Sequence, residues 1–592
     1  MSPLPTSLAL ALLFAAPPAH AVVIGIVDTG ISALHPDFFD SGGHTRIAVL
    51  VDMTLAPRGL HAELERYGGA AFTRDEIDAV AAGRPLEDGA SLPGDTEGHG
   101  THVASVAAAE AADSSLFVVR TAGAERQADD VANGARLFFE WASGRAEPAV
   151  LNLSLGRARG PRDGSAWIER LLDDLAGPGI PGRVVVASAG NDGWLPTHLR
   201  IAAEDGCTAV VDLDVAPIVE SGVVTLEVAG PPGATALGLV APAGEALGPV
   251  PFGAQAIEAA GASTFLVLPP DDADGGGRPR ALVAIEASRA QDVVGTWQLE
   301  LEGRGVFDVW IADPTEGLDV DAGVATDSFY SLRTPSTAEN VIVVAASSED
   351  LAVPRRGLPG VVRRAPFSSM GPTLDGRPKP DIAAPGENVP GALAAESILS
   401  RPDLTGLWTE DGRHIRLSGT SQAAPRVAAA AARLLARAPD LDAARVRALL
   451  VASAVPPDTA AWTPEVGFGL LDVEAALARL ELGQLGADRA REREGSRLAR
   501  ELVGLQAPAS CEAGPSGTAP ACSALPDARG QPVALLAWLA LLAGRRWYRR
   551  SAWGRRDEAP SRPQRSAARP NGRGHSQWAA HGTDRGAFAA SP

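Results

Sequence analysis

The sequence has little cysteine and lysine, and it lacks a hydrophobic run long enough to span a membrane. Its 592 residues include three cysteines, Cys207, Cys511 and Cys522. This excludes a disulfide framework for the main body, although the last two could pair with each other. No cysteines and histidines show the sequence spacing of a zinc site, and lysine is almost entirely replaced by arginine. The apolar stretch at 532–544 is shorter than the ~20 residues that a membrane-spanning helix needs.

Composition and charge indicate a large acidic globular protein. Hydrophobic residues make up 45% of the chain and charged residues 21%, which argues against wholesale disorder. A chain of 592 residues is expected to form more than one domain. The formal net charge of −20 disfavours nucleic acid as a partner.

Both ends of the chain carry segments that are typical of protein export. Residues 8–16 are apolar and precede an Ala-x-Ala pattern at 19–21, which predicts a secretory signal peptide over 1–21. Beyond residue 482 we expect a charged helix and linker (483–530), an apolar anchor or sorting segment with an arginine cluster (531–550), and a disordered basic tail (551–592). The protein is therefore expected to be secreted, or tethered to a membrane or envelope through its C-terminus.

Strand-like and helix-like segments alternate in two separated parts of the chain. In residues 22–199 and 326–482, short apolar runs alternate with helical patterns, which indicates a doubly wound, mostly parallel α/β sheet. Residues 200–325 show strand-like runs between turns rich in glycine, proline and aspartate, without a helical period. We therefore expect an α/β fold with an inserted all-β sandwich or jelly-roll domain.

Four polar residues lie at the ends of predicted core elements, in the order Asp28, His99, Asn191 and Ser421. Each motif alone is weak, because an isolated Asp-Thr-Gly is more often a turn or a helix cap. Together they provide the groups that acyl transfer needs. Ser421 at a helix start is a candidate nucleophile, and His99 is a candidate base that the Asp28 carboxylate would orient. The amide of Asn191 and a backbone N–H are candidate donors to an oxyanion.

These motifs resemble those of the subtilisin-type serine proteases, the subtilase family. The matching stretches are Val-Asp-Thr-Gly at 27–30, His-Gly-Thr-His-Val-Ala at 99–104, Ser-Ala-Gly-Asn at 188–191 and Gly-Thr-Ser-Gln-Ala-Ala-Pro at 419–425. The resemblance covers roughly residues 22–192 and 334–480. It implies a sheet of subtilisin type, Asp28, His99 and Ser421 as the catalytic triad, and Asn191 as the oxyanion donor.

The resemblance also implies where a substrate binds. An edge strand at Ser154, Leu155 and Gly156 would pair with an extended protein or peptide substrate. The pocket for the side chain before the scissile bond would be walled by Ala187, Ser188 and Gly190. The resemblance requires no cofactor.

The sequence also departs from the family's usual pattern or extends it. Asp37 matches a position that holds structural calcium in many subtilases, with a turn cap as an equal interpretation. Ser105 replaces a usual glycine, and Gln422 and Arg426 replace a usual methionine and histidine. The β-rich insert resembles that of a bacterial subgroup with an inserted jelly roll, which includes clostridial germination proteases.

Cleavage after residue 21 would leave no residues for the propeptide that usually accompanies subtilases. Either the start is truncated, or folding proceeds without a propeptide.

Two other functions remain open from the sequence. A subtilase-type ligase or macrocyclase would use the same triad but keep water from the acyl-enzyme. A catalytically silent scaffold or adhesin would bind a partner through the β insert. The intact set of Asp28, His99, Asn191 and Ser421 favours an enzyme.

Overall fold

The computed structural model of the chain describes residues 20–121, 123–203, 208–217, 223–269, 278–312, 318–322, 326–348, 362–457 and 460–504. The three cysteines, nearly all of the predicted signal peptide, the predicted apolar segment at 531–550 and the predicted basic tail lie outside these residues. Within the described ranges, no helix has both the length and the apolar character needed to cross a membrane.

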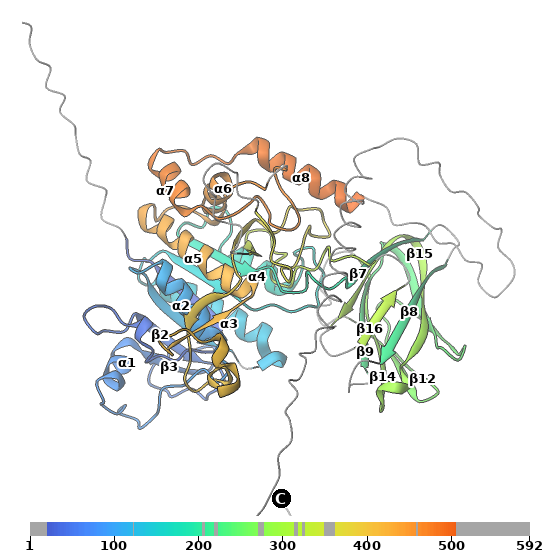
Figure 1. Ribbon diagram of the computed structural model, residues 1–592, viewed down its shortest axis with the longest axis horizontal. Coiled ribbons are helices and arrows are strands. Elements are labelled where there is room, and N and C mark those ends of the chain that lie inside the picture. Colours follow the sequence, from blue (N-terminus) through green and yellow to red (C-terminus); the bar gives the residue numbers. More distant parts are fainter. Residues whose placement is uncertain are drawn as a thin grey trace, which may run out of the picture. The chain divides into compact units, whose positions relative to one another are not determined.

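An eight-stranded sheet forms the centre of the α/β part (Figure 1). Its strands lie in the order β18 (Ile382–Pro385), β17 (Ile342–Ser347), β6 (Arg183–Ser188), β5 (Ala149–Leu153), β1 (Val23–Asp28), β4 (Ser115–Arg120), β2 (Ile47–Asp52) and β3 (Ala70–Thr73). All neighbours pair in parallel except β2 and β3. Every residue of β1 is buried, as expected for an apolar run covered on both faces.

Helices cover both faces of this sheet. On one face, α2 (His99–Glu110) and α5 (Thr420–Arg437) pack against each other. On the other face lie α3 (Gly123–Ser143) and α4 (Trp167–Leu175). Ile26 and Val27 of β1 belong to the two different cores, because successive strand residues point to opposite faces. The predicted doubly wound, mostly parallel α/β fold is confirmed.

The inserted part is a ten-stranded antiparallel sheet. Its strands are β7 (His198–Ala203), β8 (Thr208–Pro217), β9 (Val223–Ala229), β10 (Gly233–Val240), β11 (Ala246–Pro251), β12 (Ala256–Ala260), β13 (Ser263–Leu268), β14 (Arg280–Ala287), β15 (Gly295–Ala312) and β16 (Leu318–Ala322). The end strands β11 and β12 lie next to each other without pairing, so the sheet is nearly closed. The predicted all-β insert is confirmed. Its first strand begins two residues before the predicted boundary at residue 200.

The long strand β15 changes partners near its middle. Residues 295–302 pair with β8, and residues 305–310 pair with β7. Gly303 has a φ of 137°, and a β-carbon there would lie 2.6 Å from the Cα of Ala234. Glycine at position 303 therefore permits the close approach of β15 to β10, the strand that contains Ala234.

Buried ion pairs join the insert to the α/β part. The Arg162 guanidinium donates to Glu227 of β9 at 2.6 Å and lies 4.1 Å from the centre of the Trp310 ring. Within the insert, Asp308 of β15 accepts from Arg200 and Arg278, each at 2.7 Å, and hydrogen-bonds the buried His198 ring, whose Nδ1 lies 2.9 Å from Asp327 of the α/β part.

The remaining elements surround the core. They are α1 (Arg74–Ala81), α6 (Ala443–Ser453), α7 (Val473–Glu481), α8 (Arg489–Gly504), the hairpin of β19 (Val389–Ala392) and β20 (His414–Leu417), and the 3₁₀ turns η1 (Pro36–Phe38), η2 (Ala290–Asp292), η5 (Ile398–Ser400) and η6 (Pro402–Leu407). Ala499 of α8 is buried with Trp462 and Phe468. The predicted charged helix therefore packs on the α/β part.

Candidate active site

Asp28 and His99 meet at the carboxyl end of the central strand. Asp28 is the last residue of β1 and is fully buried, and His99 is the first residue of α2. The His99 Nδ1 lies 2.6 Å from the Asp28 Oδ1, which also accepts from the Thr29 N–H at 2.8 Å. The carboxylate therefore fixes both the orientation of the imidazole and the nitrogen that carries its proton.

Asp95 holds the start of α2 in place. One of its carboxylate oxygens accepts from the Gly98 N–H at 2.8 Å and the Thr29 hydroxyl at 2.9 Å. The other accepts from the N–H and the hydroxyl of Thr101, at 2.8 and 2.7 Å. A buried carboxylate at a helix N-terminus satisfies N–H groups that lack a partner in the helix. Because Thr29 follows Asp28, this carboxylate also ties the helix to the β1 turn. Asp95 was not predicted from the sequence, because it lies three residues before the N-cap Gly98 and not at the capping position itself.

The environment of His99 favours its protonated form. Burial alone would lower the pKa of His99, but the charge of Asp28 and the hydrogen bond to it raise the pKa above its ordinary value. A histidine that accepts a proton from a nucleophile needs this stabilisation of its imidazolium.

Ser421 lies in the first turn of α5, next to Ser154. The Ser421 hydroxyl donates to the backbone carbonyl of Ser154 at 3.0 Å, and the Ser154 hydroxyl donates to the carbonyl of Ser421 at 2.9 Å. Among the described residues, no hydrogen bond joins His99 to Ser421. Catalytic hydrogen bonds are often long or unformed without substrate. In this structure the Ser421 hydroxyl is hydrogen-bonded to Ser154 and not to His99.

Asn191 and the N–H of Ser421 border the same small space. The Asn191 Oδ1 accepts from the N–H and the hydroxyl of Thr420, each at 3.0 Å, and these bonds orient its Nδ2. A β-carbon on Gly419 would lie 3.4 Å from the Asn191 Nδ2 and 3.7 Å from the Ser421 nitrogen. It would also lie 2.7 Å from the Gln422 Oε1. Glycine therefore keeps open a space that two hydrogen-bond donors share.

The predicted substrate-binding segments lie on either side of this space. Residues 154–156 continue past the end of β5, which is a central strand of the sheet rather than an edge strand. Leu155 and Gly156 line an apolar pocket together with Ile168. Ala187 and Ser188 end β6 and are buried, and Gly190 follows with a φ of 109°.

Arg333 fills the gap between these two segments. A β-carbon on Gly156 would lie 3.0 Å from the Arg333 Cβ, and one on Gly190 would lie 2.8 Å from its Cγ. The guanidinium makes a two-pronged ion pair with Asp192, at 2.6 and 2.8 Å. The methylenes of Arg333 are thus held between Gly156 and Gly190. Arg333 lies far from both glycines in the sequence, so no local motif predicted its role.

The residue changes noted in the sequence have structural partners. The Ser105 hydroxyl donates to Asp37 at 2.7 Å and accepts from the Ala392 N–H at 3.0 Å, so it links α2 to η1 and β19. Arg426 of α5 pairs with Glu110 of α2 at 2.7 Å. Both changes therefore add contacts around the helices that carry His99 and Ser421.

Asp37 has two imidazoles and a hydroxyl as neighbours. His35 and His414 are within hydrogen-bonding or ion-pairing distance of it, as is Ser105. Calcium favours six to eight oxygen ligands, so this nitrogen-rich set does not fit it. Structural calcium elsewhere stays a prediction.

Comparison with known proteins agrees with this arrangement. The model of the Subtilase family (Peptidase_S8) matches residues 19–217 and 322–470. Serine protease AprX of Bacillus subtilis is 33% identical over 154 residues, which are 25% of this chain and 31% of AprX. Subtilisin E of Bacillus subtilis is 31% identical over 189 residues, which are 30% of this chain and 41% of subtilisin E. An uncharacterized protein, y4bN, of Sinorhizobium fredii is 32% identical over 225 residues, 31% of this chain and 51% of that protein.

The match to these curated relatives spans about half of their length or less. Among solved structures, the CspB protease of Clostridium perfringens has a TM-score of 0.60 at 22% identity, covering 79% of this chain and 94% of that one. This likeness concerns the fold. The family match, interrupted at residues 218–321 where most of the β insert lies, shows that the chain belongs to the subtilase family, with an inserted β domain that splits the family's α/β fold.

Proposed function

We propose that the protein is a serine endopeptidase that hydrolyses peptide bonds through Asp28, His99 and Ser421, with Asn191 as the oxyanion donor. The observation that carries this proposal is the convergence of two pairs of groups at one end of the sheet. The buried Asp28 carboxylate holds His99 at 2.6 Å, and the Asn191 amide and the Ser421 N–H face the same space above Gly419.

In the first step, the Ser421 hydroxyl leaves the Ser154 carbonyl and turns toward the His99 Nε2. His99 takes the hydroxyl proton while Ser421 Oγ attacks the peptide carbonyl carbon. The carbonyl oxygen becomes an oxyanion and accepts hydrogen bonds from the Asn191 Nδ2 and the Ser421 N–H. Asp28 stabilises the imidazolium that forms, which agrees with the raised pKa of His99.

In the second step, the imidazolium gives its proton to the leaving amine, and the C–N bond breaks. The acyl group then stays on Ser421 Oγ. His99 removes a proton from water, and the water oxygen attacks the acyl carbonyl. Collapse of this second intermediate releases the acid and returns the proton to Ser421.

A fluorophosphonate probe tests this mechanism, because it reacts only with an activated serine. We expect the probe to label Ser421 in the wild-type chain and to leave Ser421→Ala and His99→Ala unlabelled. Peptide mass spectrometry should locate the label. If the folded wild-type chain neither reacts with the probe nor cleaves casein, the proposal fails and a silent scaffold is favoured. Product masses would distinguish hydrolysis from ligation, since a ligase gives joined or cyclic peptides.

We further propose that the protein acts outside the cytoplasm, either released or tethered at the envelope. The support is the sequence of residues 1–21 and 531–550. Fractionation of cells that express the full chain, or a chain ending at residue 521, tests the tether. A tether predicts that only the shortened chain reaches the medium, and equal distribution of both forms would contradict it.

A further inference from the structure

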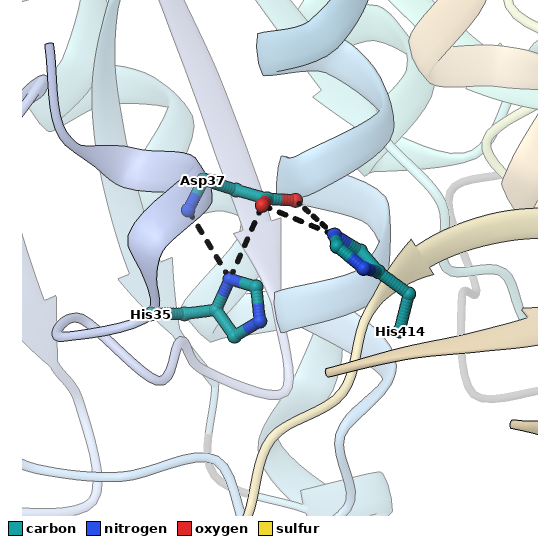
Figure 2. Close-up of side chains that lie close together, drawn as sticks. All are labelled: His35, Asp37 and His414. Atoms are coloured by element: carbon teal, nitrogen blue, oxygen red, sulfur yellow. Dashed lines mark hydrogen bonds and ion pairs between the residues drawn. The ribbon is translucent and has the colours of Figure 1, made fainter. Parts of the chain in front are cut away.

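His35, Asp37 and His414 form a cluster that the proposed mechanism does not use. Figure 2 shows the Asp37 carboxylate between the two imidazole rings. The His414 Nε2 lies 3.1 and 3.2 Å from the two oxygens of Asp37, and the His35 Nδ1 lies 3.5 Å from its Oδ1. One ligand atom from each residue lies within 4.8 Å of the other two.

The hydrogen bonds of His35 leave the nitrogen that faces Asp37 unprotonated. The His35 Nε2 is 2.9 Å from the carbonyl oxygen of Arg413, which can only accept, so Nε2 carries the proton. The Nδ1 then accepts a bond from the Asp37 N–H at 3.3 Å. The lone pair of Nδ1 is therefore occupied by this hydrogen bond, which is long at 3.3 Å, and a metal ion beside the Asp37 carboxylate would replace it.

The ring of His414 is also held by a hydrogen bond at the nitrogen that faces away from Asp37. Its Nδ1 lies 2.6 Å from the Asp411 Oδ2, and the other oxygen of Asp411 accepts from the Thr409 hydroxyl at 2.6 Å and the Arg413 N–H at 3.0 Å. A carboxylate or a backbone carbonyl behind each histidine is the usual second layer around a metal-bound imidazole. This layer directs the Nε2 of His414 and the Nδ1 of His35 toward the same point.

The distances are close to those of a four-coordinate metal. Ligand atoms 2.0–2.1 Å from a tetrahedral ion are about 3.3 Å apart. With one ligand atom from each residue, the Asp37 Oδ1 lies 3.1 Å from the His414 Nε2 and 3.5 Å from the His35 Nδ1, and all three atoms lie within 4.8 Å of one another. The side chains of Asp37 and His414 are 25% and 28% exposed, so an ion and a water ligand can enter. Two histidines and one carboxylate suit Zn²⁺ and related ions, whereas Ca²⁺ prefers an all-oxygen site.

The cluster joins segments that are far apart in the chain. His35 and Asp37 flank the start of η1, which follows the β1 turn with Asp28, and η1 packs against α2. His414 begins β20, the strand that leads through residues 418–420 to Ser421. We propose that His35, Asp37 and His414 bind a divalent transition-metal ion of the zinc class, which clamps the strand before Ser421 to the turn after Asp28.

Metal binding is tested on the full chain in a Ser421→Ala background, which prevents self-cleavage, with any affinity tag removed. After treatment with a chelator, we expect one Zn²⁺ to bind per chain by calorimetry and the unfolding temperature to rise with Zn²⁺ but not with equal Ca²⁺. His35→Ala and His414→Ala should each abolish this rise. Asp411→Asn, which keeps all three ligands, should weaken binding by about 10–100-fold.

Two control variants separate this cluster from other histidines. His44 pairs with Asp78 at 3.0 Å on the surface, so His44→Ala should bind Zn²⁺ as before. His99→Ala should also retain the tight site, since the proposed clamp is separate from the triad. Co²⁺ gives a second readout, because a tetrahedral nitrogen–oxygen site produces visible absorption that His414→Ala should remove.

A proton on the His414 Nε2 would also satisfy Asp37, and the same experiment distinguishes this alternative. If the folded chain shows no Zn²⁺ binding, or if binding is unchanged in both His35→Ala and His414→Ala, the proposal is overturned. Stabilisation by Ca²⁺ rather than Zn²⁺ would also overturn it. Because the readouts are binding and stability, a chain without protease activity can still confirm the metal site.

Discussion

Ser154 and Ser421 exchange hydrogen bonds, each hydroxyl donating to the other residue's carbonyl, at 2.9 and 3.0 Å. The reason lies four residues further along α5. Within a helix, the carbonyl of Ser421 would accept from the N–H of residue 425, but this residue is Pro425 and has no N–H. The Ser154 hydroxyl supplies the missing donor, and in this way the loop after β5 fixes the backbone of the nucleophile.

Ser154→Ala should therefore destabilise the chain by leaving a buried carbonyl without a donor, at a cost of about 1–3 kcal/mol. In a Pro425→Ala background the new N–H can bond the Ser421 carbonyl, so Ser154→Ala should cost less there. Urea unfolding of the four chains of this double-mutant cycle measures the difference. Equal costs in both backgrounds would show that Ser154 does not substitute for the missing helix bond.

The pH dependence of catalysis should reflect the pairing of His99 with Asp28. His99 must be neutral to act as a base, and its pKa is raised above 6.5. The value of kcat/KM should therefore rise with pH through a midpoint above 6.5, not below it. Asp28→Asn should lower kcat by on the order of 10⁴, the magnitude known for subtilisin itself, and move this midpoint to lower pH. A peptide substrate assayed from pH 5 to 9 tests both, and an unmoved midpoint in Asp28→Asn would contradict the assignment.

Asn191 should contribute mainly to turnover. Asn191→Ala is expected to lower kcat by roughly 10²–10³ with little change in KM, as for the corresponding amide of subtilisin. Because the Asn191 Oδ1 also holds Thr420, alanine could disturb the helix start as well. Asn191→Asp keeps an oxygen for Thr420 but removes the amide donor, and it should lower kcat at least as much. If Asn191→Asp retained full kcat, Asn191 would be a positioning residue for α5 rather than an oxyanion donor.

Arg333 should restrict the side chain that precedes the scissile bond. Its methylenes lie between Gly156, in the segment expected to pair with the substrate backbone, and Gly190, in the wall expected for this pocket. Arg333→Ala should open the gap and raise kcat/KM for substrates with Phe or Leu at this position, relative to Ala, by at least about tenfold. Asp192→Asn is the matched control, because it weakens the ion pair but leaves the methylenes in place. A substrate panel with one varied residue measures the preference, and an unchanged ratio in Arg333→Ala would exclude the role.

The sequence predicted those parts of the site that adjoin strongly patterned elements. Asp28 ends an apolar β-branched run, and His99 and Ser421 open helices of small residues, so local pattern and position were informative. The insert was predicted from the loss of helical period. The helix expected at Ser421 begins at Thr420, although it includes Pro425, a residue that local sequence patterns count against a helix. Proline and glycine lowered the local helix signal there, and packing of α5 against α2 and the sheet outweighed it.

Residues that act across distant segments could not be predicted. Arg333 contacts Gly156 and Gly190 only in the folded chain, because it lies in the second part of the α/β fold and the two glycines lie in the first part. His414 lies 377 residues from Asp37, so the cluster with His35 has no spacing that a motif could match. The hydrogen bond between Asp95 and Thr29, which are 66 residues apart, is visible only in three dimensions.

The joint between the insert and the α/β part should make stability depend on pH through His198. This histidine is fully buried, with its Nε2 3.0 Å from Asp308 and its Nδ1 2.9 Å from Asp327. Burial alone would lower the pKa of His198, but the two carboxylates raise it above 6.5. The folded chain therefore holds a proton that the unfolded chain releases near its ordinary pKa of about 6.5. Its contribution to stability is complete below this pH and is lost as pH rises through the folded-state pKa.

His198→Gln should remove this contribution, because glutamine does not titrate. We expect the free energy of unfolding to fall less steeply above pH 6.5 in His198→Gln than in the parent chain, both in a Ser421→Ala background. Identical slopes in the parent chain and His198→Gln would show that His198 is neutral in the fold and that its two carboxylate partners do not make stability depend on pH at this joint.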